Sequence, residues 1–414
     1  MQSPPQGALS IRGAQLASES PMAPYIVEHF ARLEQSRTGA KDGSSYVPLC
    51  IAENGLLKSR VMARLHACRL PPSRVLGYDS MVGAISFREA LASFMERAFL
   101  GRRFAPDQIA VLAGAGTVLE NVFYALCDPG EAVLVPTPSY AGFWTDLETR
   151  NGLHIVPVHS QSDDDFRLTA ASLEEAFLSA DRPVKALLFT NPDNPRGSVA
   201  TRQEIEEILR WADGRQIHVV FDEIYALSVF GEAHFTSAAA IRPALGDRVH
   251  IVWAFSKDFG ASGLRCGVLV SENEALLAAV NGLAYWGAVS GHTQWLLEQM
   301  IADDPWIEHY CADLRLALRS AYESVATALD AAGIPFVPAQ AGIFVLCDMR
   351  GFLTEPTWDA EAALWRRILE ECNVNLTPGS ACRIAEPGFM RLCYAAEPLD
   401  SVVTAIGRVG DLFG

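Results

Sequence analysis

Residues 254 to 267 carry the most informative chemistry of the chain: Ala254-Phe-Ser-Lys-Asp-Phe-Gly-Ala-Ser-Gly-Leu-Arg-Cys-Gly267. This small-residue turn follows an apolar, β-branched run at 249 to 253, which predicts a buried strand. Lys257 offers an amine that can hold an aldehyde as a Schiff base, and the guanidinium of Arg265 matches phosphate oxygens. A lysine after a strand is more often a solvated surface charge, so the catalytic interpretation depends on the segments that accompany it.

Two further segments place polar groups directly after apolar strands. The run 184 to 190 leads into Asn191-Pro-Asp-Asn-Pro-Arg-Gly197, where two Asn-Pro steps favour extended or turn geometry. The run 217 to 221 is followed at once by Asp222, Glu223, Ile224 and Tyr225. Open α/β sheets bind ligands at the carboxyl ends of their strands, so these groups are expected at one crevice.

Together these residue types match the needs of pyridoxal 5'-phosphate (PLP). Its aldehyde needs the amine of Lys257, and its pyridine nitrogen needs a carboxylate such as Asp222, because a protonated ring is the electron sink of the chemistry. Its phenolic oxygen needs hydrogen-bond donors, which Asn194 and Tyr225 can supply.

The order of the three segments resembles the aspartate aminotransferase fold type of PLP enzymes. Within that group, the chain is most similar to 1-aminocyclopropane-1-carboxylate (ACC) synthases and their relatives. The segments that carry this closer resemblance are Ile51-Ala-Glu-Asn54, Phe87-Arg-Glu-Ala-Leu-Ala-Ser-Phe94, Val135-Pro-Thr-Pro-Ser-Tyr-Ala-Gly-Phe143 and Pro387-Gly-Phe-Met-Arg-Leu-Cys393. The similarity spans nearly the whole chain.

The resemblance implies a role for each matching residue. Lys257 would be the Schiff-base lysine and proton shuttle, Asp222 would bind the pyridine nitrogen, and Asn194 and Tyr225 would bind the phenolic oxygen. Arg391 would grip the substrate carboxylate, as suits a guanidinium fork. Tyr140 would stack on the cofactor ring, and Ser256 and Arg265 would bind its phosphate. Without a functional role, Tyr140 would simply pack under its loop and Arg391 would be a surface arginine.

A strand at 108 to 113 precedes Gly114-Ala-Gly-Thr117, which opens a helical pattern. Backbone N–H groups at such a helix start bind phosphate, so Ala115 and Gly116 are predicted phosphate contacts. The two glycines also resemble a dinucleotide fingerprint, but Leu119 stands where the third glycine belongs, which leaves a nicotinamide oxidoreductase a weak rival.

Some positions depart from the family pattern. Many relatives carry a second phosphate-binding serine where this chain has Ala254. Relatives also send a tyrosine to the phosphate of a partner subunit, but the aligned residue is Met81, and Tyr78 lies three positions earlier. Glu53 is predicted either as an active-site acid or as a cap for a helix from Leu56. Tyr25 lies where ACC synthases place a tyrosine near the sulfonium substrate, with simple packing as its alternative.

Composition agrees with this interpretation. Half of the 414 residues are hydrophobic, enough for two cores, and the net charge of −16 disfavours nucleic acid as a partner. The sequence shows neither a targeting pattern at residues 1 to 13 nor an apolar run long enough to cross a membrane. We therefore expect a soluble, cytoplasmic protein. The nine cysteines are scattered and lack Cys-x-x-Cys spacing, which indicates neither a disulfide framework nor a zinc site.

The expected fold is α/β: a mostly parallel seven-stranded sheet flanked by helices, with a smaller, discontinuous α+β domain. Strands are predicted at 108 to 113, 132 to 136, 153 to 158, 184 to 190, 217 to 221, 249 to 255 and 266 to 271. A helical pattern runs from 272 to about 332, interrupted at Asp304-Pro305. We expect a large PLP-binding domain at 61 to 285 and a small domain formed by 1 to 60 and 286 to 414, as in the family.

The same residues permit two reactions. If the γ-carbon carries a good leaving group, as in S-adenosylmethionine, loss of the α-proton leads to γ-elimination of methylthioadenosine, with cyclisation or γ-substitution. If the cofactor carbon is reprotonated instead, the enzyme is an aminotransferase for an amino acid and a 2-keto acid.

The resemblance favours the first reaction and allows a second small-molecule acceptor. It also implies a homodimer. A catalytically silent ligand-binding protein on the same fold is the alternative of a different class, and the intact set of reactive residues argues against it.

Overall fold

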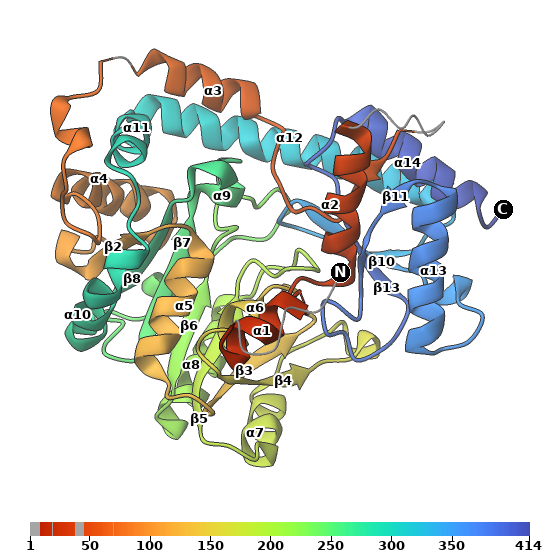
Figure 1. The fold of residues 1–414 in the computed structure, drawn as a ribbon, viewed down its shortest axis with the longest axis horizontal. Coiled ribbons are helices and arrows are strands. Elements are labelled where there is room, and N and C mark those ends of the chain that lie inside the picture. The colour runs from red at the N-terminus through yellow and green to blue at the C-terminus, as the bar shows by residue number, and fades with distance from the viewer. Residues whose placement is uncertain (1–8, 19, 38–44, 69) are drawn as a thin grey trace.

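A seven-stranded sheet forms the centre of the protein (Figure 1). The computed structural model describes residues 9–18, 20–37, 45–68 and 70–414. The strand order is β2-β8-β7-β6-β5-β3-β4, and only β8 runs antiparallel to its neighbours. The strands are β2 (Ile109–Leu112), β3 (Ala132–Thr137), β4 (His154–His159), β5 (Val184–Thr190), β6 (His218–Asp222), β7 (Val249–Ala254) and β8 (Gly267–Ser271). Each end lies within one residue of the sequence prediction, and the mostly parallel α/β sheet is confirmed.

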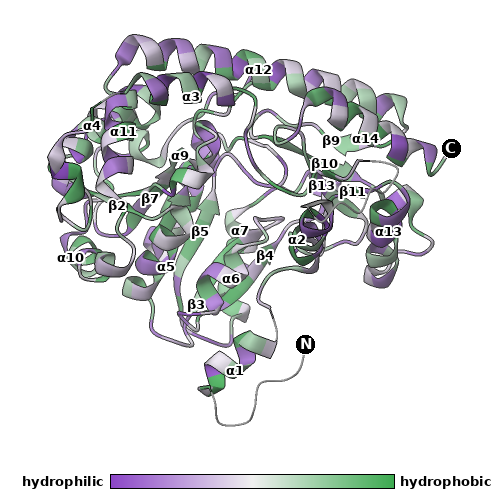
Figure 2. Ribbon diagram, turned by 45° about the horizontal axis from the view of Figure 1, so that its top comes forward, coloured by the Kyte–Doolittle hydropathy of each residue, from purple (hydrophilic) through white to green (hydrophobic). Residues whose placement is uncertain are grey.

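Both faces of this sheet are buried, which explains why its strands are near-continuous apolar runs. Successive residues of one strand enter different hydrophobic clusters: Leu187 packs on one face and Leu188 on the other, as do Val219 and Val220. Figure 2 shows hydrophobic colour along β3 and β5, whereas hydrophilic and hydrophobic residues alternate along the outer helix α12 (Asp304–Ala331).

Helices cover both faces. One face carries α5 (Ala115–Leu126), α6 (Phe143–Glu148) and α10 (Glu274–Leu283). The other carries α4 (Ile85–Met95), α7 (Ala170–Ser179), α8 (Arg202–Arg215) and α12. α11 (Gly291–Ile301) packs against α4 and α3 (Lys58–Ala67). Near the N-terminus lie α1 (Ile11–Ser18) and α2 (Pro24–Arg37), and the chain enters the short helix α9 (Phe255–Asp258) directly from β7.

A second, four-stranded antiparallel sheet has the order β12-β13-β10-β9. Its strands are β9 (Phe336–Val337), β10 (Phe344–Asp348), β12 (Thr377–Pro378) and β13 (Phe389–Cys393), and α13 (Trp358–Glu371) and α14 (Leu399–Asp411) lie beside it in Figure 1. β1 (Val47–Pro48), from the N-terminal part of the chain, pairs in parallel with β11 (Val374–Asn375). The N-terminal segment therefore packs with the C-terminal part of the fold.

Short helical turns complete the described chain. They are η1 (Ser73–Leu76), η2 (Glu96–Leu100), η3 (Pro106–Gln108), η4 (Ser162–Asp164), η5 (Ala238–Ala240), η6 (Ser262–Leu264), η7 (Ala284–Trp286) and η8 (Arg350–Phe352). None of the helices in the part of the chain that the structure describes is long and apolar enough to cross a bilayer.

Gly197 closes the Asn-Pro loop against the segment between β9 and β10. Its backbone has φ +70°, and its carbonyl accepts the N–H groups of Gln340 and Ala341, both at 2.9 Å. A side chain here would collide with the carbonyl oxygen of Ala341. Only glycine meets both constraints without strain.

We expect Gly197→Ala to lower the free energy of unfolding by about 2 kcal/mol or more, because the clash with the Ala341 carbonyl adds to a left-handed strain of about 1–2 kcal/mol. The matched control is Gly214→Ala, because a methyl group there meets nothing within 4 Å and the residue lies in α8. The control should be neutral or stabilise by about 0.5–1 kcal/mol. Urea denaturation of both variants gives the comparison, and equal stability of the two would contradict this account of the loop.

Candidate active site

Lys257 stands in α9, just beyond the carboxyl end of β7. Its Nζ donates a hydrogen bond of 2.6 Å to the carbonyl oxygen of Ala52, and the Asn54 side-chain amide donates to the Lys257 carbonyl oxygen at 3.0 Å. Burial lowers the pKa of Lys257 to about 8, although the nearby charge of Glu53 opposes this shift. An amine with this pKa is neutral far more often near pH 7 than a surface lysine.

Asp222 ends β6, the strand next to β7, and is 5% exposed. Burial raises the pKa of its carboxyl to about 7, whereas the Ile224 N–H, 3.3 Å from Oδ1, and the charge of Lys257 favour the carboxylate. Tyr225 follows, is fully buried, and packs edge-on against the ring of Phe344 with 5.3 Å between centroids. Burial raises the pKa of Tyr225 well above its usual value, so its hydroxyl remains a donor.

Arg391 enters from β13 of the second sheet and is 2% exposed. Its Nη1 donates to Asn194 Oδ1 at 3.1 Å, and its Nη2 donates to the Cys50 carbonyl at 2.7 Å and to Thr377 Oγ1 at 3.0 Å. Its Nε is buried and has no partner among the described residues. The guanidinium thus has no carboxylate partner within the described chain, and its unused donor suits an incoming anion.

Ala115 and Gly116 begin α5 after Gly114, whose φ is +93°. Arg265 reaches this helix start from the turn between η6 and β8. Its Nη2 donates to the Ala113 carbonyl at 3.4 Å and its Nη1 to Ser262 at 3.1 Å. Free N–H groups at the start of a helix, with a guanidinium beside them, form an anion-binding site. Ser256, which is 6% exposed, lies just before Lys257 in the same turn.

Tyr140 and Tyr25 come from two other segments, and both lie near enough to Arg391 for its charge to act on their hydroxyl groups. Tyr140 follows β3, is 38% exposed, and packs edge-on against Phe143 with 5.3 Å between centroids. Tyr25 lies at the start of α2 and is 5% exposed. Burial raises the pKa of Tyr25 to about 12, and the charge of Arg391 and a hydrogen bond with Thr377 oppose the shift.

Two further predicted site residues have exposed side chains. Tyr78 is 98% exposed and follows η1. Glu53 has an exposed side chain, although its charge acts on Lys257. The predicted capping role of Glu53 is wrong, because α3 begins only at Lys58 and has no side-chain cap.

Three residues near the cluster were missed from the sequence. Thr377 contacts Arg391 and also donates to Cys50 at 3.2 Å. Asn54 and Cys393 stand in segments that carry the family resemblance, but neither has a predicted role. Cys393 lies close enough to Lys257 to affect the pKa of its amine. Strand register produces the Thr377 contact, because Thr377 pairs with Arg391 across β12 and β13. No local pattern of residues reveals such a pair.

Comparison with known proteins shows the family to which the chain belongs. The family described as "Aminotransferase class I and II" matches residues 46–409. ACC synthase 7 of Arabidopsis thaliana is 38% identical over 336 residues, which is 79% of this chain and 75% of that protein. The ACC synthase of Malus domestica is 35% identical over 80% of this chain and 73% of its own. A solved aspartate aminotransferase from Thermus thermophilus with maleate has a TM-score of 0.80 and 23% identity, and covers 98% of this chain and 99% of its own.

The pKa of Lys257 predicts how cofactor-free protein takes up PLP. Only the neutral amine attacks the aldehyde, so the uptake rate should rise about tenfold per pH unit and level off near pH 8. Stopped-flow absorbance across pH 6 to 10 measures this profile. Glu53→Gln should move the midpoint down, because the Glu53 charge raises the pKa of Lys257, and Lys58→Gln should leave it unchanged. A rate that keeps rising to pH 10 would contradict the buried amine.

Proposed function

Because this chain belongs to the aminotransferase class I and II family and is a PLP-dependent enzyme related to ACC synthases, we propose that it acts at the α-carbon of S-adenosylmethionine. The reaction breaks the bond between the γ-carbon and sulfur and releases methylthioadenosine. The similarity to ACC synthases, together with Tyr25 beside the buried Arg391, is the observation that supports this substrate.

The residues present fit PLP. The anion site at the start of α5 suits its phosphate, with Ala115, Gly116, Ser256 and Arg265 as the holding groups. Asp222 is a buried carboxylate that forms no salt bridge within the described chain, which suits a protonated pyridine nitrogen. Asn194 and Tyr225 would hold the phenolic oxygen, Tyr140 would stack on the ring, and Lys257 would hold the aldehyde. When bound, PLP supplies an electron sink for the charge left at the α-carbon.

The protein's own groups then bind substrate and move the proton. Arg391 holds the α-carboxylate, and its contacts to Cys50 and Thr377 fix the direction of the guanidinium. Lys257, with its pKa near 8, takes the α-proton as a base matched to neutral pH. We propose that Tyr25 and Glu53 face the sulfonium end, where an aromatic ring and a carboxylate both favour a cation. Loss of sulfur from the γ-carbon then allows the α-carbon to close the ring of ACC, or a second small molecule to bond at the γ-carbon.

An aminotransferase is the second candidate. The same lysine could return the proton to the cofactor carbon, and solved aminotransferases share the fold along nearly the whole chain. A silent ligand-binding protein would have no need of a lysine of lowered pKa beside a buried carboxylate.

We further propose that the enzyme is a homodimer. Leu76, Tyr78, Tyr285 and Trp286 are each more than 60% exposed, and exposed side chains of this kind suit a subunit interface. In such a dimer Tyr78 would reach the phosphate of the partner subunit. We retain the division into a large domain of 61–285 and a small domain of 1–60 and 286–414 as a proposal, supported at the N-terminal end by the pairing of β1 with β11.

The direct test mixes the PLP-loaded protein with S-adenosylmethionine and follows the absorbance and, by mass spectrometry, the products. We expect methylthioadenosine to be released, and Lys257→Ala to abolish the release. Arg391→Lys keeps the charge but loses the fork, so its KM should rise by about two orders of magnitude. Light scattering on the same preparation checks the dimer, and an active monomer would contradict it.

The products separate the candidates. Free ACC identifies a synthase, whereas methylthioadenosine without a free four-carbon product indicates transfer to a second acceptor. Absence of methylthioadenosine, with no change in the absorbance, would contradict the proposed substrate. Pairs of amino acids and 2-keto acids would then be screened for transamination.

A further inference from the structure

The loop of residues 379–388 joins β12 to β13 and ends three residues before Arg391. It leaves the four-stranded sheet and touches the segment around Tyr140. The carbonyl oxygen of Cys382 accepts the N–H of Ser139 at 2.9 Å, directly before Tyr140. The guanidinium of Arg383 lies 5.0 Å from the ring centre of Trp144. One loop therefore connects the strand of Arg391 with the segment of Tyr140.

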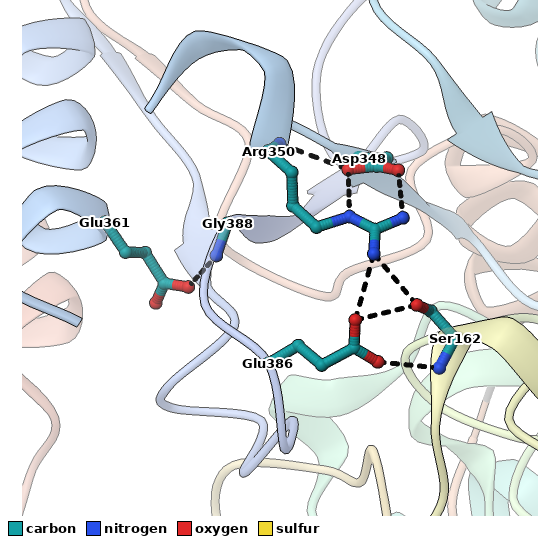
Figure 3. Close-up of polar contacts among 6 residues, drawn as sticks. All are labelled: Ser162, Asp348, Arg350, Glu361, Glu386 and Gly388. Atoms are coloured by element: carbon teal, nitrogen blue, oxygen red, sulfur yellow. Dashed lines mark hydrogen bonds and ion pairs between the residues drawn. The ribbon is translucent and has the colours of Figure 1, made fainter. Parts of the chain in front are cut away.

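Glu386 makes the third contact of this loop. Its carboxylate accepts the N–H of Ser162 at 2.7 Å and the Ser162 hydroxyl at 2.8 Å. Arg350, held by Asp348, donates to the same carboxylate and to the same hydroxyl, at 2.9 and 3.0 Å. Figure 3 shows this arrangement, in which Ser162 of η4 meets Glu386 of the loop and Arg350 of η8.

Glu361 fastens the two ends of the loop to each other. Its Oε1 accepts the N–H of Ser380 at 2.9 Å and its Oε2 accepts the N–H of Gly388 at 2.7 Å. Figure 3 shows the second bond reaching from α13 to the residue before β13. Glu361 is fully buried, and burial raises the pKa of its carboxyl. A buried carboxylate with two backbone donors holds a loop more firmly than a surface ion pair does.

We propose that loop 379–388 sets the distance between Arg391 and Tyr140, and that Glu361 and Glu386 are positioning residues for the substrate carboxylate. This inference rests on the proposed roles of Arg391 and Tyr140. Glu361 fixes the loop at the end from which β13 carries Arg391. Glu386 fixes the loop to Ser162, which follows β4. Strand β4 pairs with β3, and the Tyr140 segment follows β3.

Glu361→Gln tests the tie with little change of shape. A glutamine has one oxygen and one NH2 group, so it can accept only one of the two backbone N–H groups and turns a donor toward the other. One end of the loop is then released. Glu386→Gln weakens the contact to Ser162 and Arg350 in the same way, at a partly exposed position where folding is not at risk. Glu370→Gln is the matched control, because Glu370 lies exposed on the same helix.

The measurement is hydrogen–deuterium exchange on the PLP-loaded holoenzyme without substrate. We expect the peptide that contains Ser139 and Tyr140 to exchange on the order of tenfold faster in Glu361→Gln and in Glu386→Gln, since each loses a hydrogen bond to a charged group. Glu370→Gln should match the wild type. With S-adenosylmethionine, both variants should raise KM about tenfold and leave kcat within about threefold, since the loss falls on binding.

Unchanged exchange at Ser139 and Tyr140 in Glu386→Gln, or equal acceleration in the control, would overturn the proposal. If Glu361→Gln does not fold, Glu386→Gln alone decides. The exchange experiment contains no substrate, so failure of S-adenosylmethionine to react would contradict the proposed function and leave the coupling to be judged by exchange alone.

Discussion

Two hydrogen bonds between the turn at Ala52 to Asn54 and Lys257 hold the candidate site together. The lysine donates to the Ala52 carbonyl, and Asn54 donates to the lysine's own carbonyl. Gly260 lets the backbone at Asn54 approach so closely that any side chain at position 260 would collide with it. These contacts join the N-terminal segment to the end of β7, and they enclose the amine whose reactivity the whole arrangement requires.

Enclosure has an electrostatic consequence for the pair of Lys257 and Asp222. Burial lowers the pKa of the lysine to about 8 and raises that of the aspartate to about 7, while their opposite charges work against both shifts. The site is thus poised so that protons can be taken and returned near neutral pH. A cofactor with a cationic ring nitrogen would favour the carboxylate form of Asp222. Burial disfavours the charged forms of Lys257 and Asp222 in the protein alone. The same burial would strengthen the interaction of Asp222 with a cationic ring nitrogen.

Much of the fold could be predicted from the sequence, because strands buried on both faces are continuous apolar runs bounded by turns. The order of β5, β6 and β7 in the sheet likewise places Asn194, Asp222 and Lys257 at or just beyond the carboxyl ends of neighbouring strands. The helical region from 272 to 332 is interrupted where the sequence predicts, because α11 ends at Ile301, Asp303 caps α12 and Pro305 lies in the first turn of α12. The earlier break between η7 and α11 was not predicted.

Contacts made by tertiary pairing could not be predicted in this way. Thr377 reaches Arg391 only through the register of β12 on β13, and Glu361 meets Ser380 and Gly388 from a separate helix. Nothing in the local residue pattern marks either residue. Tyr78 shows the opposite case. It lies three positions before Met81, which aligns with the family's tyrosine, and the contact suggested for it with the phosphate of a partner subunit is not displayed by a single chain, in which Tyr78 is exposed.

The central claim is that Lys257 is the amine to which PLP is attached. Borohydride reduction of the PLP-loaded protein fixes the attachment, and peptide mapping by mass spectrometry then locates it. We expect one pyridoxyl group per chain, on the peptide that contains Lys257, and the same spectrum of labelling in Lys58→Gln. Label on Lys58 or Lys185 in place of Lys257, or no label at all, would contradict the account.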